Sequence, residues 1–423
     1  MRRDRGSDRN TSNRQSRRED VMQKSVRSTV NRRTLGVTLG AAVISALVLT
    51  ACGASASSGG SSGNTYKVAF VTELTGPFSV SRKPFDEGVV AYFKTNPSVN
   101  GKTVNVHLYD DQSNPASAPT VFRQAVSSNP AAIIDFALST STAAAEPILK
   151  GAGVPCLCIG AEDTWYTPKP QPWVFEANPT TLADAQAYVL AAQKLVGGSL
   201  QGKSIAISGD DTAYETIIRK LITTFAPKYG FHIVSTQIGP TTAPSWSSEA
   251  AKIVAAKPDA IINLTSVTGQ IVQLKALEAA GMNKIPIVAF PGLAYSDLTS
   301  LKLSNVYVMT PWPYGTPASS PVHQAAAKYG YLADEKSYEF AFGWAQAAVV
   351  RQALSTCGSS CSGSDLQKAF AGIHNYTVPG GVASGPVGFS STDHASKLPQ
   401  TMLHWNQATT SLKIAGTVTP SSS

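Results

Sequence analysis

Hydroxyl-bearing residues stand at the start of a predicted helix, directly after an apolar segment. Ser139, Thr140 and Ser141 follow the apolar residues 131–136, and the alanine-rich stretch from residue 142 has a helical composition. The free backbone amides of a helix N-terminus, together with hydroxyl groups, can hold a carboxylate or another strongly polar ligand group. The same residues could form an ordinary N-cap. The pattern therefore predicts either a polar ligand subsite or a structural cap.

A second polar group follows the next apolar segment, residues 154–159. Ala161, Glu162 and Asp163 come after it, so we expect them at the same sheet edge as residues 139–141. A buried carboxylate needs a partner, and Glu162 facing a cleft would favour a cationic or donor-rich ligand. Glu162 could instead pair with a lysine or arginine of the chain, or point to solvent. We expect Asp163 in a turn.

Aromatic residues near these segments could also form the walls of a cleft. Their rings would stack on an apolar or cationic ligand. For Trp312 we favour packing in a hinge instead. The candidates are Trp165, Tyr166, Trp312 and Tyr314.

Catalytic and metal-binding motifs do not support an enzyme. Residues 197–204 match the Walker A pattern, but a helix pattern precedes them and a strand pattern follows, the reverse of what a phosphate loop requires. Residues 59–63 have nucleophile-elbow spacing, but they lie in a Gly- and Ser-rich tether. The six histidines are scattered. We therefore expect no enzyme, metal or cofactor. A lipoprotein hydrolase is kept as an alternative, because catalytic triads are spatial.

The first 51 residues have the composition of a bacterial export signal. They hold 11 of the 35 Lys and Arg residues and 4 of the 27 Asp and Glu residues, which is +7 of the net charge of +8. The nearly neutral remainder argues against nucleic acid as a partner. An uncharged stretch over 35–51 precedes Cys52, and Leu49-Thr50-Ala51-Cys52 resembles a lipobox. We predict a signal peptide over 1–51, a flexible tether over 52–64 and acylation of Cys52, which would anchor the chain to the outer face of the cell membrane.

Two features of export stay open at this point. Translation could begin at Met22, because residues 1–21 add nothing that export needs. Arg32 and Arg33 faintly resemble a twin-arginine signal, so the export route is not assigned.

Four cysteines follow the tether, and an even number suits an oxidising compartment. Cys357 and Cys361 flank a three-residue loop and are candidates for a disulfide. Cys156 and Cys158 alternate on an apolar strand pattern and therefore point to the same face. There we expect two buried free thiols.

Strand and helix patterns alternate along the body of the chain. Apolar strand patterns such as 67–71 and 260–264 are separated by amphipathic helix patterns. This order predicts an α/β fold with parallel sheets that helices cover on both faces. Proline-rich passages near 172–181 and 310–315 divide the pattern into two blocks. We expect two doubly wound, Rossmann-like lobes joined by a multi-strand hinge, with a cleft at the carboxyl ends of the strands.

The expected boundaries of these parts follow from the same pattern. Lobe 1 comprises residues 65–175 and 315–375, lobe 2 comprises 176–314 and 376–415, and 416–423 is a disordered tail.

Short motifs follow the strands at regular places over residues 66–414. They are Leu74-Thr75-Gly76-Pro77, the segment 110–115, the segment 139–142, Gly153-Val154-Pro155, Asp210 with Tyr214, Ala279-Ala280-Gly281 and the segment 385–389. Their order and spacing together resemble the type I periplasmic binding proteins of the branched-chain amino-acid (Leu/Ile/Val) group.

The resemblance implies a solute-binding protein that captures one small molecule between two lobes and delivers it to an ABC permease. It also places the ligand contacts. These are Ser139, Thr140, Ser141, Ala161, Glu162, Tyr214, Thr265, Ser266 and Pro291. We expect a monomer without a cofactor. A ligand sensor of the same fold, serving a receptor, is the alternative.

Three departures from the family pattern concern the ligand. In amino-acid binders the loop at 290–293 carries an acid that pairs with the ligand ammonium, and Phe290-Pro291-Gly292-Leu293 has none. Glu162 stands where a small hydroxyl residue is usual, and Glu176 stands where an arginine is usual. These differences argue for a ligand other than a standard α-amino acid.

Overall fold

A computed structural model describes residues 63–159, 163–240, 242–265, 267–293 and 295–421. These residues belong to one compact unit. The predicted signal peptide, Cys52, most of the tether, Ala161, Glu162 and Ser266 lie outside the described residues. No helix in the described ranges combines the length and the apolar character that a membrane crossing requires.

The first sheet has six strands in the order β2-β3-β1-β4-β5-β6, and all pairs except β2–β3 are parallel. Residues of β1 alternate between its two faces, so that Phe70 packs in the same cluster as Phe85 of α2, while Val71 packs with Phe122 of α3. Burial on both faces explains the continuous apolar runs. The elements are β1 (Thr65–Thr72), α2 (Ser79–Thr95), β2 (Ser98–Val99), β3 (Lys102–Asp110), α3 (Ala118–Ser127), β4 (Ala132–Asp135), α4 (Ser139–Ala152), β5 (Cys156–Cys158) and β6 (Val174–Phe175).

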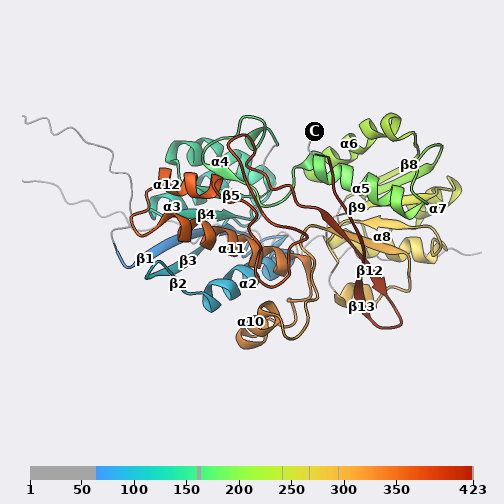
Figure 1. Ribbon diagram of the computed structural model, residues 1–423. Helices are drawn as coiled ribbons and strands as arrows, with labels where there is room; N and C mark the ends of the chain where they lie inside the picture. Colours follow the sequence, from blue (N-terminus) through green and yellow to red (C-terminus); the bar gives the residue numbers. More distant parts are fainter. Residues whose placement is uncertain (1–62, 160–162, 241, 266, 294, 422–423) are drawn as a thin grey trace, which may run out of the picture. The chain divides into compact units, whose positions relative to one another are not determined.

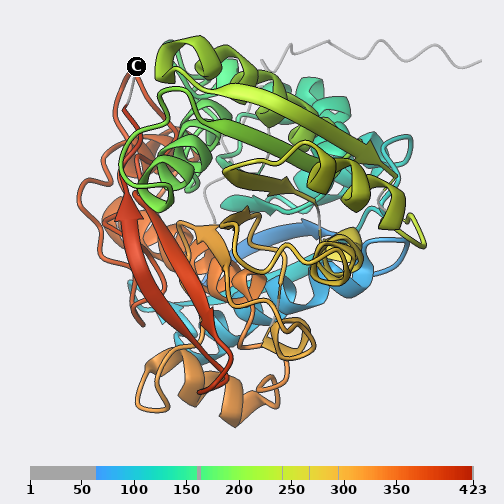
Figure 2. The ribbon, with the colours of Figure 1, turned by 90° about the vertical axis from the view of Figure 1, so that its right-hand side faces the viewer.

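The second sheet has seven strands in the order β13-β12-β11-β10-β9-β7-β8. The neighbouring strands β8, β7, β9, β10 and β11 are parallel. Strands β12 and β13 are antiparallel additions, drawn as the red ribbon in Figure 2. Helices α5 and α6 pack on one face, and α7 and α8 pack on the other (Figure 1). The elements are α5 (Thr181–Leu195), β7 (Ser204–Asp210), α6 (Ala213–Tyr229), β8 (His232–Gly239), α7 (Ser247–Ala255), β9 (Ala260–Leu264), α8 (Val267–Ala279), β10 (Ile287–Ala289), α9 (Tyr295–Thr299), β11 (Val306–Thr310), β12 (Gln400–Asn406) and β13 (Ser411–Val418).

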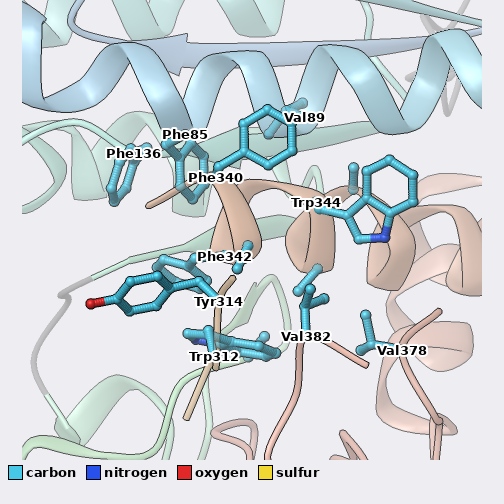
Figure 3. Close-up of a cluster of buried hydrophobic side chains, with 14 of the residues drawn as sticks. Phe85, Val89, Phe136, Trp312, Tyr314, Phe340, Phe342, Trp344, Val378 and Val382 are labelled. Atoms are coloured by element: carbon cyan, nitrogen blue, oxygen red, sulfur yellow. The ribbon is translucent and has the colours of Figure 1, made fainter. Parts of the chain in front are cut away.

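After β11 the chain returns to the first sheet through α10 (Pro321–Tyr329), α11 (Tyr338–Cys357) and α12 (Gly363–Ala371). Helix α11 packs closely against α2, and aromatic rings fill the space around this contact (Figure 3). Phe85 stacks on Phe136 with ring centroids 3.6 Å apart, and it meets Phe342 edge to face with ring centroids 5.2 Å apart. This packing holds the first residues of α2 and α11 at the carboxyl edge of the first sheet.

The chain passes between the two sheets three times, after β6, after β11 and before β12. The first two crossings are linked, because the indole nitrogen of Trp312 donates a hydrogen bond to Asn178 Oδ1. Trp312 is fully buried and stacks on Phe342 with centroids 5.3 Å apart. It therefore packs in the hinge, as the sequence predicted.

Two segments lie elsewhere than the expected boundaries. Gly416 to Val418, assigned to a disordered tail, form the end of β13, because they pair with β12. Residues 376–395 were assigned to lobe 2, but Phe389 and His394 pack on Phe175 of the first sheet at 5.4 and 4.2 Å. These contacts favour moving this segment to lobe 1, and the full division into lobes stays a proposal.

The four cysteines that follow the tether form two disulfides. Cys357 and Cys361 are bonded, as the short loop between them predicted. The expectation of free thiols at Cys156 and Cys158 is wrong, because these two residues are also bonded to each other. Both side chains lie on one face of a three-residue strand, and the Cα–Cα separation of 5.3 Å is within the disulfide range.

Candidate functional site

A cavity of about 390 Å³ lies at the carboxyl ends of the parallel strands of both sheets. Residues after β4, β5, β7 and β10 line it, as do the first two crossings, the start of β12 and the first turns of α2, α4, α5, α6 and α11. This is the position that open α/β sheets use for ligands. The lining therefore comes from two sheets, and a molecule in the cavity would contact both.

The N-terminus of α4 forms one polar end of the cavity. Ser139 and Thr140 line it, and neither backbone amide donates a hydrogen bond to any residue in the described ranges. Helix α4 has no acidic residue in its first turn, so its amides and dipole are available to an acceptor group of a ligand. Ser141 is fully buried and does not line the cavity.

Tyr214 belongs to a hydrogen-bonded group in the part of the cavity wall that comes from the second sheet and its helices. Its hydroxyl donates to Asp184 Oδ2 at 2.5 Å, and Gln400 Nε2 donates to Asp184 Oδ1 at 2.5 Å. All three residues line the cavity. Burial raises the pKa of Asp184 to about 7, although the hydrogen bond from Tyr214 opposes this shift. The group joins α5, α6 and β12, so it fixes the Tyr214 ring at the cavity wall.

Arg82 is the one cationic residue among the described residues that line the cavity. Its guanidinium lies 4.3 Å from the centroid of the Phe136 ring, and its Nε lies 3.6 Å from Glu73 Oε1. Glu73 is fully buried, and burial raises its pKa although Arg82 opposes the shift. Arg82 is thus held between an aromatic face and a carboxylate of its own lobe.

Two acidic side chains of the lining are almost completely buried. Glu215 lies in the first turn of α6 and is 4% exposed, and Glu339 lies in the first turn of α11 and is 6% exposed. Burial, with a smaller effect from Asp210, raises the pKa of Glu215 to about 8. Burial also raises the pKa of Glu339 to about 7. Both shifts show that the surroundings disfavour the ionised form of these carboxyl groups.

Aromatic and apolar side chains form much of the remaining wall. Tyr214 and Phe290 approach edge to face at 6.1 Å, and the other rings come from both sheets. Such a wall suits a ligand with an apolar body. The aromatic lining residues are Phe78, Phe136, Tyr166, Tyr188, Tyr214, Phe290, Tyr338 and Phe342.

The structure brings together four of the predicted contact residues, namely Ser139, Thr140, Tyr214 and Pro291, which all line the cavity. Thr265 is buried and accepts a hydrogen bond from Asn263 Nδ2 at 3.2 Å, and it is not part of the lining. Ala161, Glu162 and Ser266 lie outside the described residues. Their predicted contacts remain untested.

Other residues singled out in the sequence have structural contacts. Asp163 Oδ1 and Oδ2 accept hydrogen bonds from the amides of Thr181 and Leu182 at 2.9 and 3.1 Å, so it caps α5 from a turn. Trp165 packs on Trp173 away from the cavity, and Tyr314 donates to the carbonyl of Leu293.

The sequence analysis did not select Arg82, Asp184, Glu215 or Glu339. Glu215 follows Tyr214 directly, and Glu339 stands two residues after the N-cap Ser337, so each had a local signal of a helix first turn. Acidic residues are common in such turns. What distinguishes Glu215 and Glu339 from other acidic residues in such turns is that their helices begin at the same cavity.

Comparison with known proteins agrees with this architecture. A family model described as periplasmic binding protein matches residues 65–410. No curated protein matches the sequence at a significant level.

Solved structures of ABC transporter substrate-binding proteins have a similar fold. One from Aeropyrum pernix is 17% identical with a TM-score of 0.72, covering 85% of this chain and 96% of its own. One from Rhodopseudomonas palustris HaA2, in complex with p-hydroxybenzoic acid, is 16% identical with a TM-score of 0.71, covering 84% and 97%. LivJ from Streptococcus pneumoniae, in complex with isoleucine, is 20% identical with a TM-score of 0.67, covering 84% and 100%. At these identities the similarity concerns the fold.

Proposed function

This chain belongs to the periplasmic binding protein family, and we propose that it captures a small polar molecule, amino-acid-like, an amide or a related compound, and delivers it to an ABC permease. The observation that carries the proposal is the cavity of about 390 Å³, which residues of both sheets line. A ligand held there contacts both lobes only when they are close together. It therefore favours the closed form, which a permease can distinguish from the open form.

The proposed binding residues form two subsites of opposite character. Ser139 and Thr140 offer hydroxyls and free amides at the N-terminus of α4, which suit an acceptor group of the ligand. Tyr214, fixed by Asp184, offers an aromatic face and a phenolic oxygen. Pro291 and the aromatic wall enclose the body of the ligand. No covalent step is needed, since capture and release perform the function.

Truncation of either subsite should weaken binding. Ser139→Ala and Tyr214→Ala should each cost about 1–3 kcal/mol of binding free energy, because each removes a buried hydrogen-bonding group from the ligand. Thr140 is exposed, so its replacement by alanine should weaken binding less than either of these substitutions. Isothermal titration of the solute that stabilises the protein most would measure the change. Affinity equal to wild type in both variants would remove these residues from the site.

We also propose that the chain is a lipoprotein on the outer face of the cell membrane and acts as a monomer. The basic leader, the apolar stretch and the small residues before Cys52 support this placement. Replacement of Cys52 by alanine should move the protein from the membrane fraction to the soluble fraction of lysed cells. Immunoblotting of the two fractions measures this, with Cys357→Ala as a matched control. Membrane association that persists in the Cys52 variant would contradict the anchor.

A further inference from the structure

Five carboxyl groups and one cationic side chain line the cavity within the described ranges. Three of the carboxyl groups have partners in the chain. Asp163 caps α5, Asp184 accepts from Tyr214 and Gln400, and Glu176 accepts from the amide of Asn178 at 2.9 Å. The other two are Glu215 and Glu339.

Among the described residues, neither Glu215 nor Glu339 has a partner from another residue. In the part of the chain that the structure describes, no lysine, arginine or histidine nitrogen lies within 4.0 Å of either carboxylate. Neither accepts a hydrogen bond from another described residue, and each is bonded only to its own backbone amide. Both are more than nine-tenths buried and face the cavity. A buried carboxylate without a partner costs several kcal/mol, so a ligand group is the expected partner.

Arg82 does not fill this role. Its closest carboxylate is that of Glu73, at 3.6 Å, and its guanidinium is stacked on Phe136. The positive charge of Arg82 lowers the pKa of both Glu215 and Glu339, yet both pKa values stay far above the usual value. The dipoles of α6 and α11 favour acids in their first turns, but such acids do not need to be buried.

The two carboxylates come from different sheets. Glu215 begins the helix that follows β7 of the second sheet, and Glu339 begins α11, which packs on α2 of the first. A cation that contacts both would therefore draw the two sides of the cavity together. Aromatic rings around them, such as Tyr214 and Tyr338, add favourable contacts to a cation.

Building on the proposed function, we propose that the solute carries a protonated amine, which pairs with Glu215 and Glu339. This subsite takes the place of the acid that the loop Phe290–Leu293 lacks. The amides of Ser139 and Thr140 line the same cavity and can donate hydrogen bonds to a carboxylate on the same molecule. The shared requirement is therefore the ammonium group, on either a simple amine or an amino acid.

Two sets of matched probes separate these chemistries. Benzylamine, phenylglycine and phenylacetate share a phenyl ring on one saturated carbon, and 3-methylbutylamine, leucine and 4-methylpentanoate share a branched aliphatic body. Each set contains an amine, an amino acid and a carboxylate. Isothermal titration of the full chain should show binding of the amine or the amino acid in at least one set. The carboxylate of that set should bind at least tenfold more weakly. Preference between the amine and the amino acid shows whether the solute also needs a carboxylate.

Variants connect this preference to the two residues. Glu215→Gln and Glu339→Gln keep the side-chain size and should each weaken binding of the preferred amine-bearing probe tenfold or more. Asp211→Asn is the matched control, because Asp211 lies at the same end of α6 but is exposed and outside the lining. Its affinity should stay within about twofold of wild type. Far-ultraviolet circular dichroism of each variant shows that the fold is retained.

The affinity should also rise with pH. In the empty cavity the pKa values of Glu215 and Glu339 are raised to about 8 and about 7, so both residues are largely protonated at pH 6. An ammonium group binds the ionised forms, and alkylamines stay protonated through this range. The logarithm of the association constant should therefore rise between pH 6 and 8, by up to about one per pH unit for each proton released.

Other charged groups also affect how the association constant changes with pH. Asp210, Arg82 and Arg219 act on Glu215, and Arg82 and Asp297 act on Glu339. Asp184, whose pKa burial raises to about 7, lines the same cavity and should leave a small slope in the double Gln variant.

Three results would overturn the inference. The first is equal or tighter binding of a carboxylate than of its amine and amino acid partners, and the second is unchanged affinity in both Gln variants. In either case a solute still binds, so the proposed function stands and the amine subsite falls. The third is absence of binding by all six probes at 10 mM, which rejects the amine subsite for ligands of this size. The wider solute screen then decides the proposed function separately.

Discussion

Replacement of Gly343 by alanine should destabilise the protein by about 3 kcal/mol, because α2 and α11 leave no space for a methyl group where they meet. A Cβ on Gly343 would fall on the backbone carbonyl of Phe85. On the opposite helix, a Cβ on Gly88 would fall on the carbonyl of Phe340 and lie 2.9 Å from the amide nitrogen of Trp344. Backbone atoms inside helices cannot rotate away, so the helices themselves must separate.

Gly151 provides the matched control for this substitution. It lies inside α4, has no positive φ, and a Cβ there would meet nothing within 4 Å. Gly151→Ala should therefore be neutral or stabilise by about 0.5–1 kcal/mol, as expected for alanine in a helix. Urea unfolding monitored by circular dichroism gives both values. If Gly343→Ala unfolded at the same urea concentration as Gly151→Ala, the close contact of the two helices would be refuted.

The close contact between α2 and α11 also sets the positions of two residues of the cavity. Arg82 lies in α2 and Glu339 lies in α11, and both line the cavity. A wider spacing between the helices would move these two charges relative to each other. We therefore expect any Gly343→Ala protein that folds to bind its solute more weakly than wild type.

Most of the fold could be predicted from the sequence. Strand β9, for example, is buried along its whole length, and in the sequence it is a largely apolar run between amphipathic helices. Such a pattern indicates parallel sheets whose two faces are both covered. The phosphate-loop match at 197–204 was rejected by the same reasoning, and the structure confirms that α5 ends before it and β7 follows. The family expected from the motifs is confirmed by a model match over residues 65–410.

The elements that the sequence analysis did not predict are short or depend on residues that are distant in the sequence. Helix α12 has a capping box formed by Ser362 and Asp365, a signal that is present in the sequence but follows a Ser-rich segment. β6 has only two residues and is defined by its pairing with β5. The disulfide between Cys156 and Cys158 depends on the local geometry of β5, which an alternating pattern does not specify.

The site could be predicted only in part for a related reason. Ser139, Thr140, Tyr214 and Pro291 follow strands, so the rule for open α/β sheets places them at the carboxyl edge. Glu339 is separated from Glu215 by more than 120 residues, and its helix follows the second crossing rather than a strand. Only the packing of α11 on α2 brings it to the cavity. Local sequence carries no sign of this.

The second large effect concerns the binding of the solute itself. A ligand present at about 100 times its dissociation constant should stabilise the protein by about 2.7 kcal/mol. For a chain of this size the melting temperature should rise by a few degrees. The effect requires that the ligand binds the folded state alone, which holds for a cavity built from two sheets.

Ala213→Trp tests where the solute binds. Ala213 is the exposed first residue of α6 and lines the cavity, so an indole there would occupy ligand space without entering the core. The melting temperature without ligand should stay close to that of wild type. The shift caused by the solute should disappear.

The most direct test of solute capture in this cavity is therefore a thermal-shift screen of the full chain and of its Ala213→Trp variant. The solutes are amino acids, amides, amines, small carboxylates and aromatic acids. We predict that one chemical class raises the melting temperature of the wild type and leaves the variant unchanged. A wild-type melt that no solute shifts, or a shift that persists in Ala213→Trp, would contradict solute capture in this cavity.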